Sequence, residues 1–217
     1  MEIIYLGHSA FKLKGRTSSI VCDPFDPKTV GIKFPPVSSE IVTISHNHDD
    51  HNRADLVKET RKIIDSPGEY EISGISILGI KTYHDNQKGT KRGSNCIYVF
   101  EIDEIRIAHL GDLGHTLSEN TIEEMGDIDI LIIPVGGFYT IGPKEASEIV
   151  QDVEPSITIP MHFYSKGLNE EMFGKLEPVD AFLKETGFVV ERLPKLSIKK
   201  YEIKEEESKI VMLDIRD

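Results

Sequence analysis

Three histidines and two aspartates lie within residues 46 to 51, where the sequence reads His-Asn-His-Asp-Asp-His. Three imidazole rings this close would repel one another if all were protonated. A divalent cation removes that conflict, because neutral imidazole and ionised carboxylate are good ligands for zinc and similar metals. A polar surface turn is the simpler alternative, but three of the chain's eight histidines fall in this segment. We therefore predict that the segment binds metal.

An apolar run over residues 40 to 44 precedes the cluster and predicts a strand that ends there. A loop at the end of a strand can direct alternate residues at one point. His46 and His48 can then hold one metal ion, while Asp50 and His51 turn toward a second.

The spacing His46-x-His48-x-Asp50-His51 resembles the HxHxDH signature of the metallo-β-lactamase superfamily. Further motifs of that family follow in the expected order, each near a strand-like segment: Asp23, His84, the pair Gly111-Asp112, and His162. The resemblance covers roughly residues 1 to 165.

Local motifs point to one branch of that superfamily. They are Gly7 to Phe11, Gly111 to His115, Gly136 to Pro143 and Pro160 to Phe163. They resemble a branch of small metal-dependent hydrolases, which is related to ascorbate-6-phosphate lactonases and to the phospholipase D that releases N-acylethanolamines.

The resemblance implies two metal ions that share a bridging carboxylate, Asp112. The first ion would be bound by His46, His48 and His84. The second ion would be bound by Asp50, His51 and His162. Zinc is the expected metal, with manganese or iron as alternatives, because these ions accept the same ligand types.

The resemblance also implies a reaction. A hydroxide bound between the two metals would attack an ester, lactone or phosphoester bond of a small substrate. Two divalent ions, two carboxylates and this hydroxide leave the site net positive, which suits an anionic substrate or a developing oxyanion. The sequence does not choose among the three bond types.

Other polar residues have supporting roles by this resemblance. Asp23 matches a carboxylate that orients the histidine loop. His8 and His115 are candidates to protonate a leaving group, or else are hydrogen-bonded structural histidines. Asp50 is assigned to catalysis as well as to metal binding. His109 lies within a predicted strand, and we assign it to packing.

Composition limits the remaining function classes. The chain has 217 residues, 39% of them hydrophobic, and a formal net charge of −12. That charge repels nucleic acid, and we interpret the one dense basic stretch, Lys88 to Arg92, as a solvated loop. No apolar run is long enough to cross a bilayer, and no signal peptide is visible. With only two cysteines, Cys22 and Cys96, we expect reduced thiols and a cytoplasmic location.

Short segments rich in Ile and Val, mixed with a few helical ones, predict an α/β or α+β fold. Predicted strands cover 2–6, 10–14, 19–22, 40–44, 75–80, 96–101, 105–110, 129–135, 197–203 and 209–215. Predicted helices cover 52–62, 118–125, 143–150 and 178–186, and a charged turn covers 204–208. No linker divides the chain, so we expect one domain, residues 1 to 217. The resemblance implies a four-layer αββα sandwich with the metals at one edge of its sheets.

Alternative functions stay open. A nuclease or phosphodiesterase of the same superfamily is opposed by the acidic charge. An iron-based redox protein is opposed by His48, because that branch of the superfamily carries Glu at this position. A non-catalytic metal-binding protein of this fold is opposed by the complete ligand set. The segment after Phe163 has no motif that we can assign, and the sequence does not indicate the oligomeric state.

Overall fold

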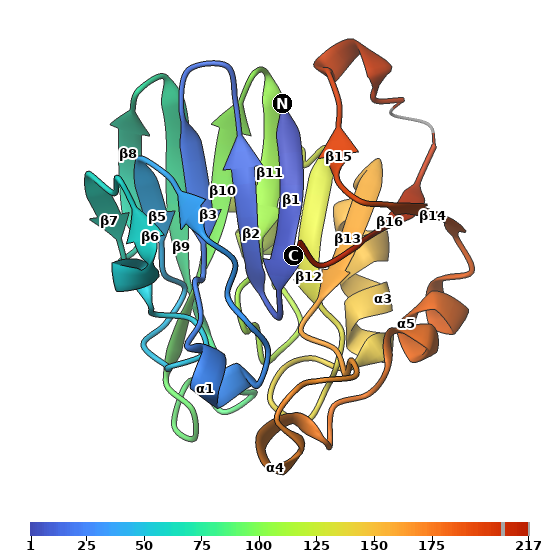
Figure 1. The fold of residues 1–217 in the computed structure, drawn as a ribbon. Helices are drawn as coiled ribbons and strands as arrows, with labels where there is room; N and C mark the ends of the chain where they lie inside the picture. Colours follow the sequence, from blue (N-terminus) through green and yellow to red (C-terminus); the bar gives the residue numbers. More distant parts are fainter. Residues whose placement is uncertain (205–206, 217) are drawn as a thin grey trace.

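Two β-sheets stacked face to face form the body of the molecule in a computed structural model that describes residues 1–204 and 207–216 (Figure 1). The six-stranded sheet has the order β15 (Leu196–Ser197), β1 (Glu2–Gly7), β2 (Ala10–Lys14), β3 (Ser19–Cys22), β5 (Ile41–Thr43), β7 (Lys62–Ile64). The eight-stranded sheet has the order β14 (Val189–Leu193), β16 (Lys209–Leu213), β13 (Ile157–Met161), β12 (Ile130–Pro134), β11 (Ile105–His109), β10 (Ser94–Ile102), β9 (Ile75–Tyr83), β8 (Gly68–Ile72). A small pair is formed by β4 (Val37–Ser38) and β6 (Val57–Lys58).

Helices cover the outer faces of both sheets, but unequally. The helices are α1 (Pro27–Val30), α2 (Glu119–Met125), α3 (Pro143–Val153), α4 (Glu170–Phe173) and α5 (Val179–Thr186), with 3-10 turns at Ala54–Leu56 and Lys200–Glu202. One apolar core fills the space between the sheets, a second lies under α2, α3 and α5, and a third lies under α1, α4 and the loops near them. The expected αββα sandwich is therefore confirmed, although the layer on the six-stranded sheet is made of short helices and loops.

Parallel strands bring the chemically interesting loops to one edge. β3 and β5 run parallel in one sheet, and β11, β12 and β13 run parallel in the other. Their residues are almost all buried, as expected for strands covered on both faces. Because parallel strands end at the same edge, the loops after β3, β5, β11 and β13 emerge together. The helices α1 and α4, which follow β3 and β13, both lie at the lower edge in Figure 1.

Two of the elements predicted from the sequence are wrong, the helix over 52–62 and the strand over 197–203. The helix expected over 52–62 is a 3-10 turn at Ala54–Leu56 followed by the short strands β6 and β7. Its buried residues Ala54 and Val57 face the third core, and Glu59 has a left-handed φ of 62° that interrupts any helix. The strand expected over 197–203 ends at Ser197, and strands β7, β8 and β14 were not predicted.

The other helices agree with the prediction within a few residues. α2 begins after Ser118, whose hydroxyl accepts from the backbone N–H of Thr121 as a cap. α3 and α5 begin beside a proline and extend as far as Val153 and Thr186. The charged turn predicted over 204–208 includes residues 205–206, which lie outside the described residues.

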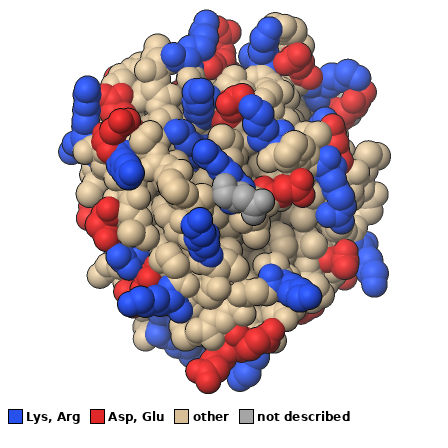
Figure 2. Space-filling view, in the orientation of Figure 1, with Lys and Arg blue, Asp and Glu red and all other residues tan. Residues whose placement is uncertain are grey.

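The surface carries charges of both signs. Figure 2 shows acidic and basic side chains interspersed over one face, with no field of a single sign there. No helix among the described residues is both long and apolar enough to span a membrane. Cys22 and Cys96 are buried free thiols.

A hydroxyl links the two sheets beside the histidine loop and gives a first prediction. Tyr98 Oη on β10 lies 3.2 Å from the carbonyl oxygens of both Ile44 and Ile64. Tyr98→Phe should lower the free energy of unfolding by about 1 kcal/mol, because a buried hydrogen bond is lost. Urea denaturation would measure it. Tyr70→Phe is the control, because the Tyr70 hydroxyl bonds to the carbonyl of the exposed Ser66. Equal losses of unfolding free energy in both variants would contradict the prediction.

Candidate metal centre

The predicted ligands lie in loops at one edge of the sandwich. His8 lies in the loop after β1, and His46, His48, Asp50 and His51 lie in the loop after β5. His84 follows β9, Asp112 follows β11 and His162 follows β13. Residues far apart in the sequence therefore share one site because of strand order.

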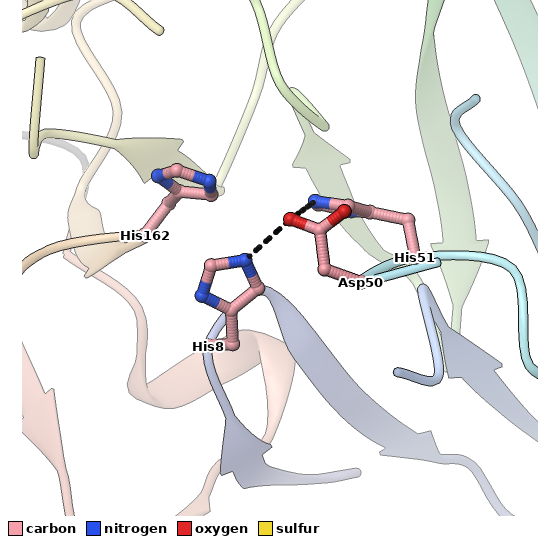
Figure 3. A group of neighbouring side chains, drawn as sticks. All are labelled: His8, Asp50, His51 and His162. Atoms are coloured by element: carbon pink, nitrogen blue, oxygen red, sulfur yellow. Dashed lines mark hydrogen bonds and ion pairs between the residues drawn. The ribbon is translucent and has the colours of Figure 1, made fainter. Parts of the chain in front are cut away.

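Their ligand atoms form three overlapping groups, and within each group they lie within 4.8 Å of one another. The groups are His46, His48 and His84; His46, His51 and Asp112; and His8, Asp50, His51 and His162. Figure 3 shows the last group, whose side chains point toward one another with Asp50 between His8 and His51. The two ligand sets expected from the sequence are thus brought together, and His8 joins the second set.

The Asp112 carboxylate lies at the centre and is only 1% exposed. Its Oδ2 atom is 3.2 Å from His84 Nε2 and 3.3 Å from the Nε2 atoms of His51 and His162. His46 Nε2 lies 3.9 Å from the same oxygen. Four imidazole rings therefore converge on one carboxylate oxygen.

Several buried polar atoms of this cluster have no hydrogen-bond partner among the described residues. They are His46 Nε2, His51 Nε2, His84 Nδ1, Asp112 Oδ1 and both ring nitrogens of His162. An unpaired buried polar group costs about 1–3 kcal/mol, and native proteins rarely tolerate several together. Imidazole nitrogens and carboxylate oxygens facing one point are the ligand set that zinc and related ions prefer. The residues present therefore fit a metal.

Asp23 and Ser45 orient two of the rings. Asp23 accepts hydrogen bonds from the Ser45 backbone N–H at 2.7 Å, from the Ser45 hydroxyl at 2.6 Å and from His51 Nδ1 at 2.9 Å. Because the Ser45 hydroxyl donates to Asp23, its oxygen accepts from His46 Nδ1 at 3.0 Å. Both rings then hold an Nδ1 proton outside the cluster and direct Nε2 into it, where a metal can displace any proton that Nε2 carries.

The electrostatics of the cluster favour a cation. Burial opposes ionisation of Asp112, but His162 and His51 lower the pKa of its carboxyl well below the usual range. Burial opposes protonation of His51, yet Asp112 and Asp50 raise the pKa of its ring well above the usual value. Burial and the charge of His51 lower the pKa of His46 to about 3. The buried carboxylates thus attract positive charge to the centre, which in the metal-free protein is a proton on His51.

Three residues of the site have left-handed backbone geometry: His8 (φ 55°), Asp23 (φ 45°) and His162 (φ 50°). Each follows its strand directly, so the reversal of φ turns the side chain out of the strand's alternation. Such geometry costs about 1–3 kcal/mol for a residue with a side chain and persists only where its surroundings impose it. Here the His8 carbonyl accepts from the backbone N–H of His162 at 3.1 Å and from the Tyr5 hydroxyl at 2.8 Å.

Two glycines allow other loops to press against the candidate ligands. A Cβ atom at Gly114 would lie 2.3 Å from the carbonyl carbon of His84. A Cβ atom at Gly136 would lie 2.1 Å from the carbonyl oxygen of His162. Only glycine fits at either position, so the loops after β11 and β12 fix the backbone of two ligands.

His8 and His115, the two candidate proton donors, have different surroundings. His8 is 3% exposed, and its Nε2–H donates to Asp50 Oδ2 at 3.1 Å. His115 accepts from the Tyr83 backbone N–H at 3.3 Å and donates to the Thr116 carbonyl at 2.7 Å. His115 belongs to none of the ligand groups of the described residues, so this geometry does not support it as a proton donor.

His109 is buried beneath the site. Its Nε2–H donates to the Ser9 carbonyl at 2.9 Å, and its Nδ1 accepts from the Gly111 backbone N–H at 3.2 Å. With both ring nitrogens paired, His109 has the structural role expected from its position in β11.

A cavity of about 460 Å³ opens onto the cluster. Its walls include, beside the ligands, the side chains of Lys91, Arg92, Tyr139, Met172 and Phe173, none of which was predicted to face the site. A neighbouring cavity of about 500 Å³ shares Asn47, His48 and Arg92 with it. The interpretation of residues 88–92 as a solvated loop fits the exposed Lys88 and Lys91, but it misses that Lys91 and Arg92 line the cavity.

Residues 2–162 match the family model described as the beta-lactamase superfamily domain. This chain belongs to the metallo-β-lactamase superfamily. It is 29% identical, over 75% of its length and 84% of the relative's, to a protein named metal-dependent hydrolase from Thermococcus onnurineus.

Solved structures of this superfamily share the fold. A crystal structure from Thermotoga maritima, assigned to the Zn-dependent hydrolases of the metallo-β-lactamase superfamily, is 40% identical with a TM-score of 0.80. That match covers 98% of this chain and 97% of the other. An isothiocyanate hydrolase from Delia radicum gut bacteria shares the fold alone, with 14% identity, a TM-score of 0.68, and coverage of 100% and 98%. The comparisons confirm the metal-dependent hydrolase branch expected from the motifs.

Ser45 offers a test of this metallo-β-lactamase site that leaves all candidate ligands intact. Ser45→Ala should weaken zinc binding about tenfold to a hundredfold, because His46 loses the partner that orients its ring. Competition with a chromophoric chelator would measure the affinity. Ser39→Ala, another buried serine with a backbone hydrogen bond, should bind zinc as the wild type does. Equal affinities in all three proteins would contradict the role of Ser45.

Proposed function

We propose that this protein hydrolyses an ester, lactone or phosphoester bond of a small, anionic molecule at a site for two divalent metals. The observation that carries the proposal is the convergence of the Nε2 atoms of His51, His84 and His162 on the Asp112 carboxylate. Those of His51 and His162 are buried without a hydrogen-bond partner among the described residues. The first ion would be held by His46, His48 and His84, the second by Asp50, His51 and His162, with Asp112 between them. Zinc is the metal that we propose, with Mn²⁺ or Fe²⁺ as alternatives.

When bound, two cations would lower the pKa of an attacking water and polarise the bond that is cleaved. In the balanced reaction the water oxygen forms the new bond to carbon or phosphorus, the bond to the leaving oxygen breaks, and the leaving oxygen takes up one of the two protons of that water. Asp112 and Asp50 are ionised and offset part of the positive charge. Asp23 and Ser45 keep the lone pairs of His51 and His46 directed inward.

His8 positions Asp50 in this proposal. Burial and the neighbouring His162 lower the pKa of His8 to about 4, so the ring is neutral near pH 7 and donates Nε2–H to Asp50. That hydrogen bond leaves the second carboxylate oxygen of Asp50 for metal or water. Because the single proton of this neutral ring is held by Asp50, the geometry gives His8 a positioning role rather than the role of proton donor.

The cavity supports a small-molecule substrate. Its volume of about 460 Å³ lies within the usual range of about 300–1,000 Å³ for small-molecule sites. A nuclease of this superfamily needs a basic surface to hold a phosphate backbone. The net charge of −12 and the mixed charges on the face in Figure 2 do not favour that alternative.

Metal analysis tests the proposal first. Purified wild-type protein, reconstituted with zinc, manganese or iron, should hold about two metal equivalents per chain. His48→Ala should hold less, because a ligand of the first ion is lost. Elemental analysis gives both numbers, and little or no metal in the reconstituted wild type would refute the site.

Turnover separates an enzyme from a non-catalytic metal-binding protein. The metal-loaded wild type should hydrolyse at least one of a panel of activated esters, lactones and phosphodiesters. Asp50→Ala should lower kcat/KM by about a hundredfold or more, since it removes both a ligand and the partner of His8. Ser39→Ala serves as the control for handling and folding. Equal rates in Asp50→Ala and wild type would show that the turnover comes from elsewhere.

The pH dependence of metal binding follows from His51. Asp112 and Asp50 raise the pKa of the His51 ring, so in the metal-free protein the ring binds a proton that a metal must displace. Zinc uptake should therefore release protons. The apparent affinity should fall as the pH falls, by about tenfold per pH unit for each proton displaced. Calorimetry in buffers of different ionisation enthalpy measures this release, and uptake without it would contradict the assignment of His51.

A further inference from the structure

The loop that follows β9 is built around one buried carboxylate. Asp85, next to the candidate ligand His84, is 4% exposed. Its Oδ1 atom accepts from the backbone N–H groups of Gln87 at 2.7 Å and Gly89 at 3.0 Å. Its Oδ2 atom accepts from those of Lys91 at 3.0 Å and Arg92 at 2.8 Å.

These hydrogen bonds make the loop rigid. Burial opposes ionisation of Asp85, but the four backbone N–H groups outweigh it and lower the pKa of its carboxyl to about 2. The backbone N–H of His84 also donates to the Gly93 carbonyl at 3.1 Å, which closes the loop on itself. Lys91 and Arg92 are therefore presented from a fixed backbone rather than from a flexible tip.

Both cations line the cavity that opens onto the metal cluster. Among residues 1–204 and 207–216, no carboxylate forms an ion pair with either of them, although Asp49, Asp50 and Asp112 line the same cavity. These two adjacent cations line the cavity without a carboxylate partner, so both are available to a ligand.

Arg92 is held in place by the loop across the cavity. One guanidinium nitrogen, Nη2, donates to the Phe138 carbonyl at 3.2 Å, and the guanidinium carbon lies 5.4 Å from the centre of the Tyr139 ring. Phe138 has a left-handed φ of 56°, which turns its carbonyl out of the regular course of the chain. Nη2 is thus engaged, and the other N–H groups of the guanidinium are left to bind an oxyanion.

The wall of the cavity beside Arg92 is aromatic. Tyr139 packs against Phe173 with ring centres 6.2 Å apart, and the Tyr139 hydroxyl donates to the Met172 carbonyl at 2.8 Å. All three residues line the cavity. One cavity therefore offers a metal cluster, a pair of cations and an aromatic wall.

We propose that Lys91 and Arg92 form a subsite for a non-reacting oxyanion of the substrate, a carboxylate or a phosphate. The carbon skeleton of the substrate lies against Tyr139 and Phe173, and the bond to be cleaved lies over the His/Asp cluster. This inference rests on the proposed function for the bond-breaking step, but the anion subsite itself can be measured without turnover. It narrows the substrate to a bifunctional molecule, with one hydrolysable bond and one separate anionic group.

A matched pair of esters tests the inference through turnover. 4-Nitrophenyl hemiglutarate and 4-nitrophenyl valerate have the same reacting bond and differ by a terminal carboxylate. The metal-loaded wild type should prefer the carboxylated ester by about tenfold to a hundredfold in kcat/KM, after subtraction of the uncatalysed rate. In the double variant Lys91→Gln/Arg92→Gln this ratio should fall close to one. Lys88→Gln, in the same loop but not among the residues that line the cavity, should keep the wild-type ratio.

Binding gives a readout that is independent of catalysis. Calorimetric titration with glutarate, and separately with inorganic phosphate, should show binding to the zinc-loaded wild type and to Lys88→Gln. The double variant should bind at least about tenfold more weakly, with the same zinc content. Tighter binding of glutarate would show that the subsite prefers a carboxylate. Tighter binding of inorganic phosphate would show that it prefers a phosphate.

The failures of the two proposals are distinguishable. Equal affinities and equal ester ratios in the wild type and the double variant would overturn the subsite, because anions would then bind only at the metals. If the wild type hydrolyses neither ester but loses anion affinity in the double variant, the subsite stands and the proposed hydrolysis of such esters fails.

Discussion

The rest of the structure depends on one electrostatic constraint, the burial of the Asp112 carboxylate among imidazole rings. A buried charge is costly unless positive charge or hydrogen bonds compensate it. The backbone N–H of Asp112 donates to Asn95 Oδ1, but the carboxylate Oδ1 atom of Asp112 has no hydrogen-bond partner among the described residues. The rings around it supply lone pairs as well as protons. A cation at the centre compensates the charge of the carboxylate and also accepts the lone pairs of the rings. The carboxylate and the rings alone cannot meet both needs.

The fold meets this constraint with backbone geometry rather than with side-chain adjustment. Parallel strands deliver the loops to one edge, and single left-handed residues turn His8, Asp23 and His162 toward the site. Gly114 and Gly136 let neighbouring loops touch the backbone of the ligand loops. The free-energy cost of backbone strain at these positions is offset by the packing of the sheets behind them, which are buried and contribute to two apolar cores.

The sequence was most informative where chemistry and local pattern coincide. The cluster at 46–51 could be predicted because scarce residue types follow an apolar strand at short spacing. The wrong helix over 52–62 has a different origin: Val57 pairs with Val37 in a two-stranded sheet, and such pairing with a distant segment leaves no periodic signal. Lys91 and Arg92 were missed for a similar reason, since their contact with residues 138–139 depends on the tertiary fold.

The metal cluster and the proposed anion subsite are mechanically connected, because His84 and Asp85 are adjacent in the chain. Gly114 packs against both of these residues, so a shift in the Asp85 loop would also move His84. Specificity in this architecture can therefore change through the side chains that the loop presents far more easily than through the path of its backbone. In members of the superfamily that keep this loop, the same metal chemistry can act on different substrates when the residues equivalent to Lys91, Arg92 and Tyr139 differ. The carboxylate equivalent to Asp85 must stay, because it organises the loop.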